Sequence, residues 1–241
     1  MYLSTTIVDR IVMTLSVVLG GGSVLLLALM GSIQPVHLRV SDSIVLLWDA
    51  ILSFAFFLQH SGMVRKGFRA RMAVFIPPCY QGAIYSIASG VVLIIVVVLW
   101  QRSEIQLLSL EGLPLWIARG CSLLAILIFA WAIHALGSFD AFGLRPIKSH
   151  MRGQSDQPLP FVVRGPYRWV RHPLYFCVLI LIWASPELTA DRLLFNVLWT
   201  AWIVVGTILE ETDLLADFGD VYRDYQRKVP MLIPWRGRMQ P

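Results

Sequence analysis

Long apolar stretches separated by short polar ones run along the whole chain. Each stretch is predicted to be a helix, because in lipid every backbone N–H and C=O must be hydrogen-bonded within the protein. The predicted spans are Ile11–Met30, Ile44–His60, Ile84–Trp100, Trp116–Leu136, Leu174–Ala184 and Leu193–Leu209. The fifth is short for a full crossing, which takes about 20 residues. This pattern predicts an all-α fold, a polytopic membrane helix bundle with about six spans.

The composition agrees with a membrane protein and excludes an ordinary soluble domain. Of the 241 residues, 57% are hydrophobic and 15% are charged, and the mean hydropathy is +0.68. Soluble domains carry about 25% charged residues. The three cysteines, Cys79, Cys121 and Cys177, lie in or beside apolar stretches without CxxC spacing. We therefore predict neither a disulfide framework nor a metal site.

Positive charge is concentrated in alternate loops. Of the 20 Lys and Arg residues, only Arg39, Arg102, Arg119 and Arg192 fall on the side opposite to the N-terminus. Because cytoplasmic loops carry an excess of Lys and Arg, both termini are predicted to be cytoplasmic. The net charge of +5 then reflects topology and attraction to anionic membrane lipid. We predict no nucleic-acid partner, and no protein partner is evident.

A polar block, Gly165–Tyr175, lies directly before and into the fifth stretch. It contains two arginines, a histidine and two tyrosines, and charges at the end of a span are expensive unless they have a task. The sixth stretch ends in the adjacent acids Glu210 and Glu211. The fifth and sixth spans are joined by a turn at Ser185–Thr189 and form an antiparallel hairpin. We therefore expect the acids to face the block and pair with its cations. The alternative is a pair of solvated acids just outside the lipid.

Beyond these acids, residues 212–229 are predicted to form an amphipathic helix. Apolar side chains recur there at helical spacing: Leu214, Leu215, Phe218, Tyr222, Tyr225 and Val229. Aspartates come early and basic residues late, which suits the helix dipole. Such a helix either lies on the membrane surface or closes over a cytoplasmic pocket.

Three further polar residues lie near the predicted cytoplasmic ends of spans. His60 ends the second span, His134 is close to the end of the fourth, and Asp140 follows it. A histidine at a helix end is more often a satisfied interfacial residue than a catalyst. The three are nevertheless candidates for acid–base chemistry, because they share one membrane face with the polar block.

The block, the acids and the tail resemble the C-terminal half of the membrane methyltransferases, which include isoprenylcysteine carboxyl methyltransferases and phospholipid N-methyltransferases. The motifs are Gly165–Tyr175, Glu210–Glu211, Tyr222–Tyr225 and Val229–Pro234. Three more, Gln59–Ser61, Phe139–Leu144 and Ser185–Thr189, extend the resemblance to bacterial methanethiol S-methyltransferases and the similar NnrU proteins. One departure is Cys177, where the superfamily usually has Gly, and we expect it to narrow the space near the hairpin.

The resemblance implies S-adenosyl-L-methionine as the cofactor and methyl transfer to a small thiol such as methanethiol, giving dimethyl sulfide. The implied cofactor site comprises Gly165, Tyr167, Arg171, His172, Pro173, Tyr175, Glu210, Glu211, Tyr222 and Tyr225, and the catalytic candidates are His60, His134, Asp140 and Arg171. Residues 137–241 are then a cofactor-binding hairpin and tail, and residues 1–136 a four-span bundle of the same membrane domain. A bacterial inner membrane is implied. The alternatives are a prenylated or lipid-like acceptor, and an NnrU-like protein without methyl transfer.

The residue types suit these implied roles. Carboxylates suit ribose hydroxyls or an amino group, and Arg168 or Arg171 suits the cofactor carboxylate as a charge-assisted pair. Tyrosines can stack on adenine or face the sulfonium, and Pro173 is tolerated in the first turn of a helix. A thiol reacts as its thiolate, so a nearby histidine base would assist the acceptor.

Overall fold

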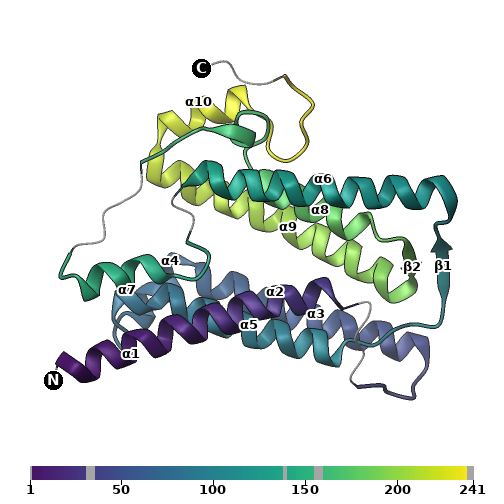
Figure 1. Ribbon diagram of the computed structural model, residues 1–241, viewed down its shortest axis with the longest axis horizontal. Helices are drawn as coiled ribbons and strands as arrows, with labels where there is room; N and C mark the ends of the chain where they lie inside the picture. Colours follow the sequence, from purple (N-terminus) through teal and green to yellow (C-terminus); the bar gives the residue numbers. More distant parts are fainter. Residues whose placement is uncertain (1, 31–35, 138–139, 155–159, 238–241) are drawn as a thin grey trace. The chain divides into compact units, whose positions relative to one another are not determined.

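The computed structural model describes residues 2–30, 36–137, 140–154 and 160–237, and Phe139 of the predicted motif lies outside them. The described chain is almost wholly helical (Figure 1), which confirms the all-α class. It forms two compact units. Unit 1 comprises Met1–Ser103 and Asp140–Pro158, and unit 2 comprises Glu104–Phe139 and Leu159–Pro241. The functional division into residues 1–136 and 137–241 stays a prediction.

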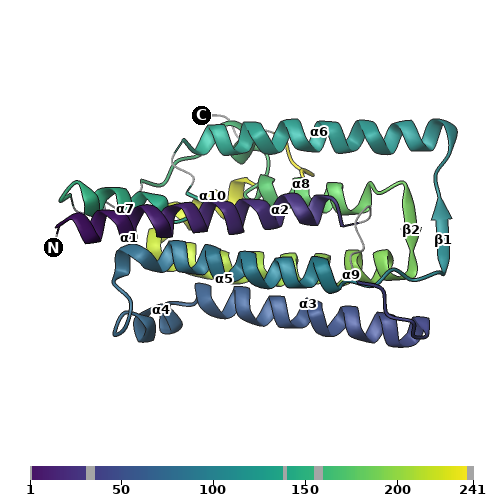
Figure 2. The ribbon, with the colours of Figure 1, turned by 60° about the horizontal axis from the view of Figure 1, so that its bottom comes forward.

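Unit 1 contains three apolar spans and two short helices. Its elements are α1 (Tyr2–Leu15), the π-helix η1 (Ser16–Gly21), α2 (Gly22–Ala28), α3 (Asp42–Val64), α4 (Lys66–Met72), α5 (Pro78–Leu99) and α7 (Leu144–Met151). Helix α5 is its centre, because the α1–η1–α2 segment, α3 and α7 all pack against it (Figure 2).

Glycines let the first span lie directly on α5. A Cβ atom on Gly90 would lie 2.5 Å from the carbonyl oxygen of Leu19, and one on Gly20 would lie 2.3 Å from Oγ of Ser86. No side chain fits 2.5 Å from a backbone atom, so a larger residue at position 90 would push the two helices apart. Small residues set close helix packing in membranes in the same way.

A second close approach anchors the segment before α7. Gly143 has φ = 65°, and a Cβ there would lie 2.3 Å from the carbonyl carbon of Gly82 on α5. The carboxylate of Asp140 accepts hydrogen bonds from the backbone N–H of Leu144 (2.9 Å) and of Arg145 (2.7 Å). These bonds satisfy donors in the first turn of α7 that have no partner within the helix. Asp140 is thus a helix-capping residue.

Substituting Gly143 with Ala is expected to lower the thermal unfolding midpoint of the purified protein by several degrees. The left-handed conformation costs a non-glycine residue about 1–2 kcal/mol, and the new Cβ would also collide with the α5 backbone. Gly153→Ala is the matched control, because Gly153 has φ = 64° but open space around it. Equal midpoints for the two variants would show that the approach to α5 contributes nothing.

Unit 2 contains the remaining apolar helices and a small sheet. Its elements are β1 (Gln106–Ser109), α6 (Gly112–Leu136), the 3-10 helix η2 (Gly165–Arg168), α8 (Pro173–Trp183), β2 (Glu187–Thr189), α9 (Ala190–Phe218) and α10 (Asp220–Lys228). Helix α8 packs on α6, and α8 and α9 form the predicted hairpin (Figure 1).

The end of this hairpin is a strand, where the sequence pattern predicts only a turn at Ser185–Thr189. Strands β1 and β2 pair antiparallel, with Gln106 opposite Thr189 and Leu108 opposite Leu188. Backbone N–H and C=O groups need hydrogen-bond partners, and two extended connections lying side by side supply them to each other. A strand of three or four residues is too short to leave a hydropathy pattern in the sequence.

Five helices in the described part of the chain are long and apolar enough to cross a membrane. The fifth predicted span is α8, which has 11 residues, against about 20 for a full crossing. Helix α9 has 29 residues, or about 44 Å at 1.5 Å per residue, which exceeds a hydrocarbon core of about 30 Å. Its final turns, with Glu210 and Glu211, therefore continue beyond the apolar stretch.

The prediction of a separate helix over residues 212–229 is wrong at its start. Residues 212–218 continue α9, and the chain turns at Gly219 (φ = 56°, ψ = −131°) before α10 begins at Asp220. Glycine adopts this conformation readily because it has no Cβ. The short helix α10 is amphipathic as predicted, since Tyr222 and Tyr225 are buried while Val221 is exposed.

Candidate functional site

The polar block is held between α6 and the end of the tail in unit 2. Gly165 opens η2 with φ = 53°, and a Cβ there would lie 2.8 Å from Cβ of Ala135 on α6. Further along, the backbone N–H of Arg171 donates to the carbonyl of Pro230 at 2.9 Å, and that of His172 donates to Met231 at 3.1 Å. Backbone hydrogen bonds to the tail and the close contact with α6 therefore hold the block in place, independently of its polar side chains.

Arg171 and Glu211 form a buried, two-pronged ion pair, which confirms that the acids face the block. Nε of Arg171 donates to Oε1 of Glu211 at 2.5 Å, and Nη2 donates to Oε2 at 2.9 Å. The two side chains are only 9% and 11% exposed. Nη1 of Arg171 also donates to the carbonyls of Gln226, at 3.0 Å, and Val229. One guanidinium thus ties α9 to the end of α10.

Three more donors converge on the Glu211 carboxylate. They are Nε2 of His172 (3.2 Å), the hydroxyl of Tyr222 (3.3 Å) and the amide of Gln226 (3.1 Å). A carboxylate that accepts this many bonds is stabilised in its charged form. With Arg171 these residues form what we call the Glu211 lock. Its oxygens are occupied by protein groups, so the lock is suited to shaping the site.

The tyrosines of α10 lie in an apolar cluster beneath the lock. Tyr222 is 1% exposed and Tyr225 is 6% exposed, and both rings contact Phe161 edge-on. The hydroxyl of Tyr225 donates to the carbonyl of Tyr167 at 2.5 Å. Burial, reinforced for Tyr222 by the charge of Glu211, raises the pKa of both tyrosines, so both hydroxyls stay protonated donors. Their predicted contact with the cofactor stays a prediction, and their packing supports a positioning role.

Glu210 is the accessible acid of the pair. Its side chain is 44% exposed, and Oε2 accepts a hydrogen bond from the hydroxyl of Tyr175 at 2.8 Å. His172 stacks on Tyr175 with a centroid distance of 5.7 Å and lies 3.9 Å from Glu210 through Nδ1. Burial, and then the negative charge of Glu210, raises the pKa of Tyr167. These aromatic groups hold Glu210 while leaving it open to a ligand.

Arg168 is the residue of the block that could bind a ligand beside Glu210. Its Nε is buried and has no hydrogen-bond partner among the described residues. A buried donor without a partner is unfavourable and calls for an explanation. In contrast to Arg171, which is taken up by the Glu211 lock, Arg168 is therefore suited to bind an anionic group of a ligand.

The catalytic candidates outside the block are divided between the units. In unit 1, the Tyr85 hydroxyl lies 2.6 Å from Nε2 of His60, whose ring packs on Phe56. Asp140, also in unit 1, caps α7, and its orientation of a catalytic histidine stays a prediction. His134 is exposed near the end of α6 in unit 2. Among the described residues, no group of three His, Cys, Asp or Glu side chains could hold a metal ion.

Sequence reasoning missed two residues of this site. Gln226 donates to Glu211, and Phe161 covers the rings of Tyr222 and Tyr225. Gln226 lies four residues after Tyr222 and so on the same helical face, which is a signal that could have identified it. Phe161 lies in a connection without periodicity, and nothing in its sequence surroundings indicates its partners. Cys177 is fully buried in α8.

Comparison with known proteins gives the family. No protein-family model and no solved structure matches the chain. A protein named methanethiol S-methyltransferase from a Pseudomonas species is 38% identical over 200 residues, covering 81% of this chain and 75% of that protein. Methanethiol S-methyltransferase 2 from Bradyrhizobium diazoefficiens is 36% identical over 189 residues, covering 78% and 73%. Nurim from Rattus norvegicus is 25% identical over 187 residues, covering 70% and 68%. At these identities and coverages, the chain belongs to the methanethiol S-methyltransferase family.

Proposed function

We propose that this protein transfers a methyl group from S-adenosyl-L-methionine to methanethiol, giving dimethyl sulfide. The observation that carries the proposal is the 38% identity to a protein of that name over 81% of the chain. The site of unit 2 supports it, because it has an accessible carboxylate and an arginine donor that has no partner among the described residues. These two groups suit a ligand that carries both an ammonium and a carboxylate group.

Within the block, Glu210 is proposed to bind the amino group or the ribose hydroxyls of the cofactor, and Arg168 its carboxylate. Bound S-adenosylmethionine supplies a methyl group on a sulfonium, a good leaving group. The Glu211 lock keeps Glu210 and His172 in place, and alignment of the reacting groups is the main source of acceleration in such a displacement.

The acceptor must also lose its proton, since the thiolate is the nucleophile. The proton of the S–H bond would pass to a base, and a sulfur electron pair would form the new S–CH3 bond. The bond between this methyl group and the sulfonium would break, and S-adenosylhomocysteine would leave. The proposed bases are His60, which is paired with Tyr85, and the exposed His134. Asp140 and Arg171 remain proposed contributors through the capping and the lock described above.

We place the protein in a bacterial inner membrane with both termini in the cytoplasm. The five helices long enough to span support the membrane location, and the strong loop asymmetry of Lys and Arg supports the orientation. Termini on one side require an even number of crossings, so α8 is proposed to make the sixth, short one. In this orientation the end of α9 with Glu210 faces the compartment in which S-adenosylmethionine is made.

The function is tested by offering the purified protein S-adenosylmethionine with methanethiol, with a farnesyl-cysteine, or with buffer alone. Dimethyl sulfide formed in the first reaction, with no methyl ester in the second, is the expected result, read by gas chromatography and by release of S-adenosylhomocysteine. Methylation of the farnesyl-cysteine but not of methanethiol would show that the acceptor is a prenylated molecule. Cofactor binding without turnover of either acceptor would favour an NnrU-like protein, and absence of binding would overturn the proposal.

A further inference from the structure

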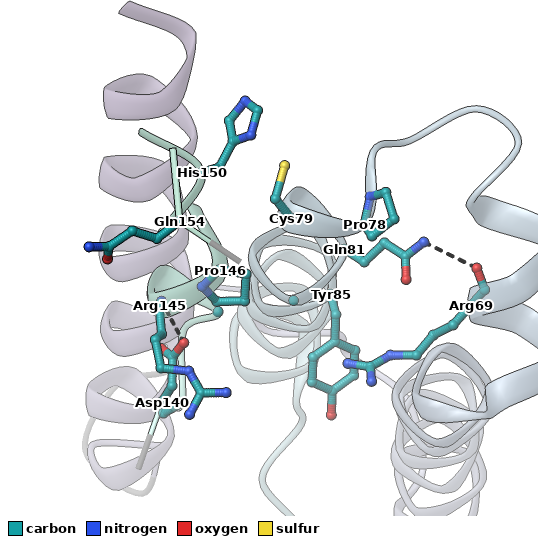
Figure 3. Close-up of a pocket in the computed structure, with 13 residues that line it drawn as sticks. Arg69, Pro78, Cys79, Gln81, Tyr85, Asp140, Arg145, Pro146, His150 and Gln154 are labelled. Atoms are coloured by element: carbon teal, nitrogen blue, oxygen red, sulfur yellow. Dashed lines mark hydrogen bonds between the residues drawn. The ribbon is translucent and has the colours of Figure 1, made fainter. Parts of the chain in front are cut away.

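Unit 1 has an open cavity whose arginines have no role in the proposed methyl transfer. Its volume is about 590 Å³, and it lies where α4, the start of α5 and α7 come together (Figure 3). The residues that matter here are Arg69 from α4, Tyr85 from α5, and Arg145 and His150 from α7. In the view of Figure 3, Arg69 extends toward Tyr85 from one side, and Arg145 lies on the other side. Methanethiol has two heavy atoms, so the cavity is far too large for it.

The side chains that line the cavity carry more positive than negative charge. Arg69 and Arg145 contribute two permanent positive charges. Asp140 is the only acid among the lining residues, all of which are described, and its oxygens accept the N–H groups of Leu144 and Arg145. The arginines therefore outnumber the acid, and the acid is already engaged in capping α7.

The start of α5 adds to this field. Pro78, Cys79 and Gln81 from its first turn line the cavity, and this turn contains no acidic residue. The N-terminus of a helix carries a partial positive charge and presents unpaired N–H groups, which favours anions, above all phosphates. The two arginines and the N-terminus of α5 thus both favour an anion in the cavity.

The surroundings point to the surface of a membrane. Between α4 and α5, Val74 is 78% exposed and Phe75 is 83% exposed, and they come about one helical turn after the basic residue Arg71. Exposed apolar side chains beside cations are typical of a segment that lies in the headgroup region. Helix α5, which begins at Pro78, is itself one of the spanning helices, so its first turn lies at the edge of the hydrocarbon.

We propose that this cavity binds a phosphate group, supplied by the headgroup of an anionic phospholipid, with Arg69 and Arg145 as its charge-assisted partners. Arginine is well matched to phosphate because its planar fork makes paired hydrogen bonds. This ligand is distinct from the cofactor and the thiol, so the site serves the attachment of unit 1 to acidic lipid.

The test is native mass spectrometry of delipidated protein titrated with phosphatidylglycerol, phosphatidylcholine or inorganic phosphate. Wild-type protein is expected to prefer phosphatidylglycerol to phosphatidylcholine. Arg69→Gln and Arg145→Gln should each weaken phosphatidylglycerol binding about tenfold, the effect of losing one hydrogen bond to a charged group. Arg145→Lys should fall between wild type and Arg145→Gln, because lysine keeps the charge but loses the paired hydrogen bonds of the guanidinium.

Arg71→Gln is the matched control, because Arg71 lies on α4, is exposed, and does not line the cavity. It should change lipid binding less than twofold, and thermal unfolding midpoints show that each variant is folded. If Arg71→Gln and Arg69→Gln weakened phosphatidylglycerol binding equally, the lipid would be responding to surface charge in general. That result would overturn the proposal. Binding of inorganic phosphate without phosphatidylglycerol would overturn the lipid source. Displacement of the lipid by S-adenosylmethionine would assign the cavity to the cofactor.

Discussion

Replacing Glu211 with Gln is expected to abolish methyl transfer and to loosen the C-terminal tail. The substitution leaves the buried Arg171 guanidinium without its counter-charge, and removing one partner of a buried ion pair costs about 3–5 kcal/mol. Arg171 also carries the bonds to the carbonyls of Gln226 and Val229, so the effect reaches α10. We expect more than a hundredfold loss of activity, a lower thermal midpoint, and new proteolytic cleavage around Gly219.

A double variant separates the lock from chemistry. A buried ion pair can often be replaced by apolar residues of similar size without loss of stability. Arg171→Met combined with Glu211→Leu should therefore regain part of the midpoint lost in Glu211→Gln while activity stays absent, because His172 and Glu210 lose their orientation. A Glu211→Gln protein with a wild-type midpoint and wild-type protease resistance would contradict the lock.

The spans could be predicted from the sequence because membranes impose one rule on the backbone. A long apolar stretch in lipid must be helical, so hydropathy alone located the first four spans and the start of α9. The meeting of the acids with the polar block was also predictable. Antiparallel neighbours joined by a short connection bring their outer ends together, and Arg171 and Glu211 meet in this way.

The sequence could not show which of the two acids is buried. Neighbouring residues on a helix point about 100° apart, so the answer depends on how α9 is rotated about its axis. In α9 the buried face includes Trp199, Ile203, Thr207 and Glu211. The opposite, exposed face is also apolar, as Val205 shows, because lipid is as apolar as a protein core. Hydrophobic periodicity therefore does not mark the inner face.

The break between α9 and α10 was missed for a related reason. The apolar spacing continues from Leu215 and Phe218 to Tyr222, although these residues lie on two helices. They form one cluster with Phe161, so packing preserves the spacing across the turn at Gly219. A glycine within an amphipathic pattern is compatible with either a continuous helix or a turn, and only the partners of the flanking residues decide between them.

Glu210→Gln is expected to weaken S-adenosylmethionine binding and to lower kcat/KM by about ten- to a hundredfold, while leaving the fold intact. A hydrogen bond to a charged group contributes about 1.5–3 kcal/mol, and Glu210 is the acid whose side chain is open to a ligand, at 44% exposure. Its neutral replacement can still accept the Tyr175 hydroxyl, so the thermal midpoint should match wild type. Calorimetric titration with the cofactor measures the affinity directly.

Asp220→Asn is the matched control for this variant. The Asp220 side chain is 89% exposed, and within the described chain its ion pair is with the exposed Arg223. It removes one negative charge near the end of α9 without touching the block, and its affinity for S-adenosylmethionine should equal that of wild type. The comparison with Glu211→Gln distinguishes the two acids. A variant that loses cofactor affinity but keeps its thermal midpoint has lost an acid that faces the ligand. A variant that loses both has lost an acid of the Glu211 lock. Wild-type affinity and turnover in Glu210→Gln would show that Glu210 does not bind the cofactor. The proposed site, in which Glu210 and Arg168 bind different groups of S-adenosylmethionine, would then be wrong.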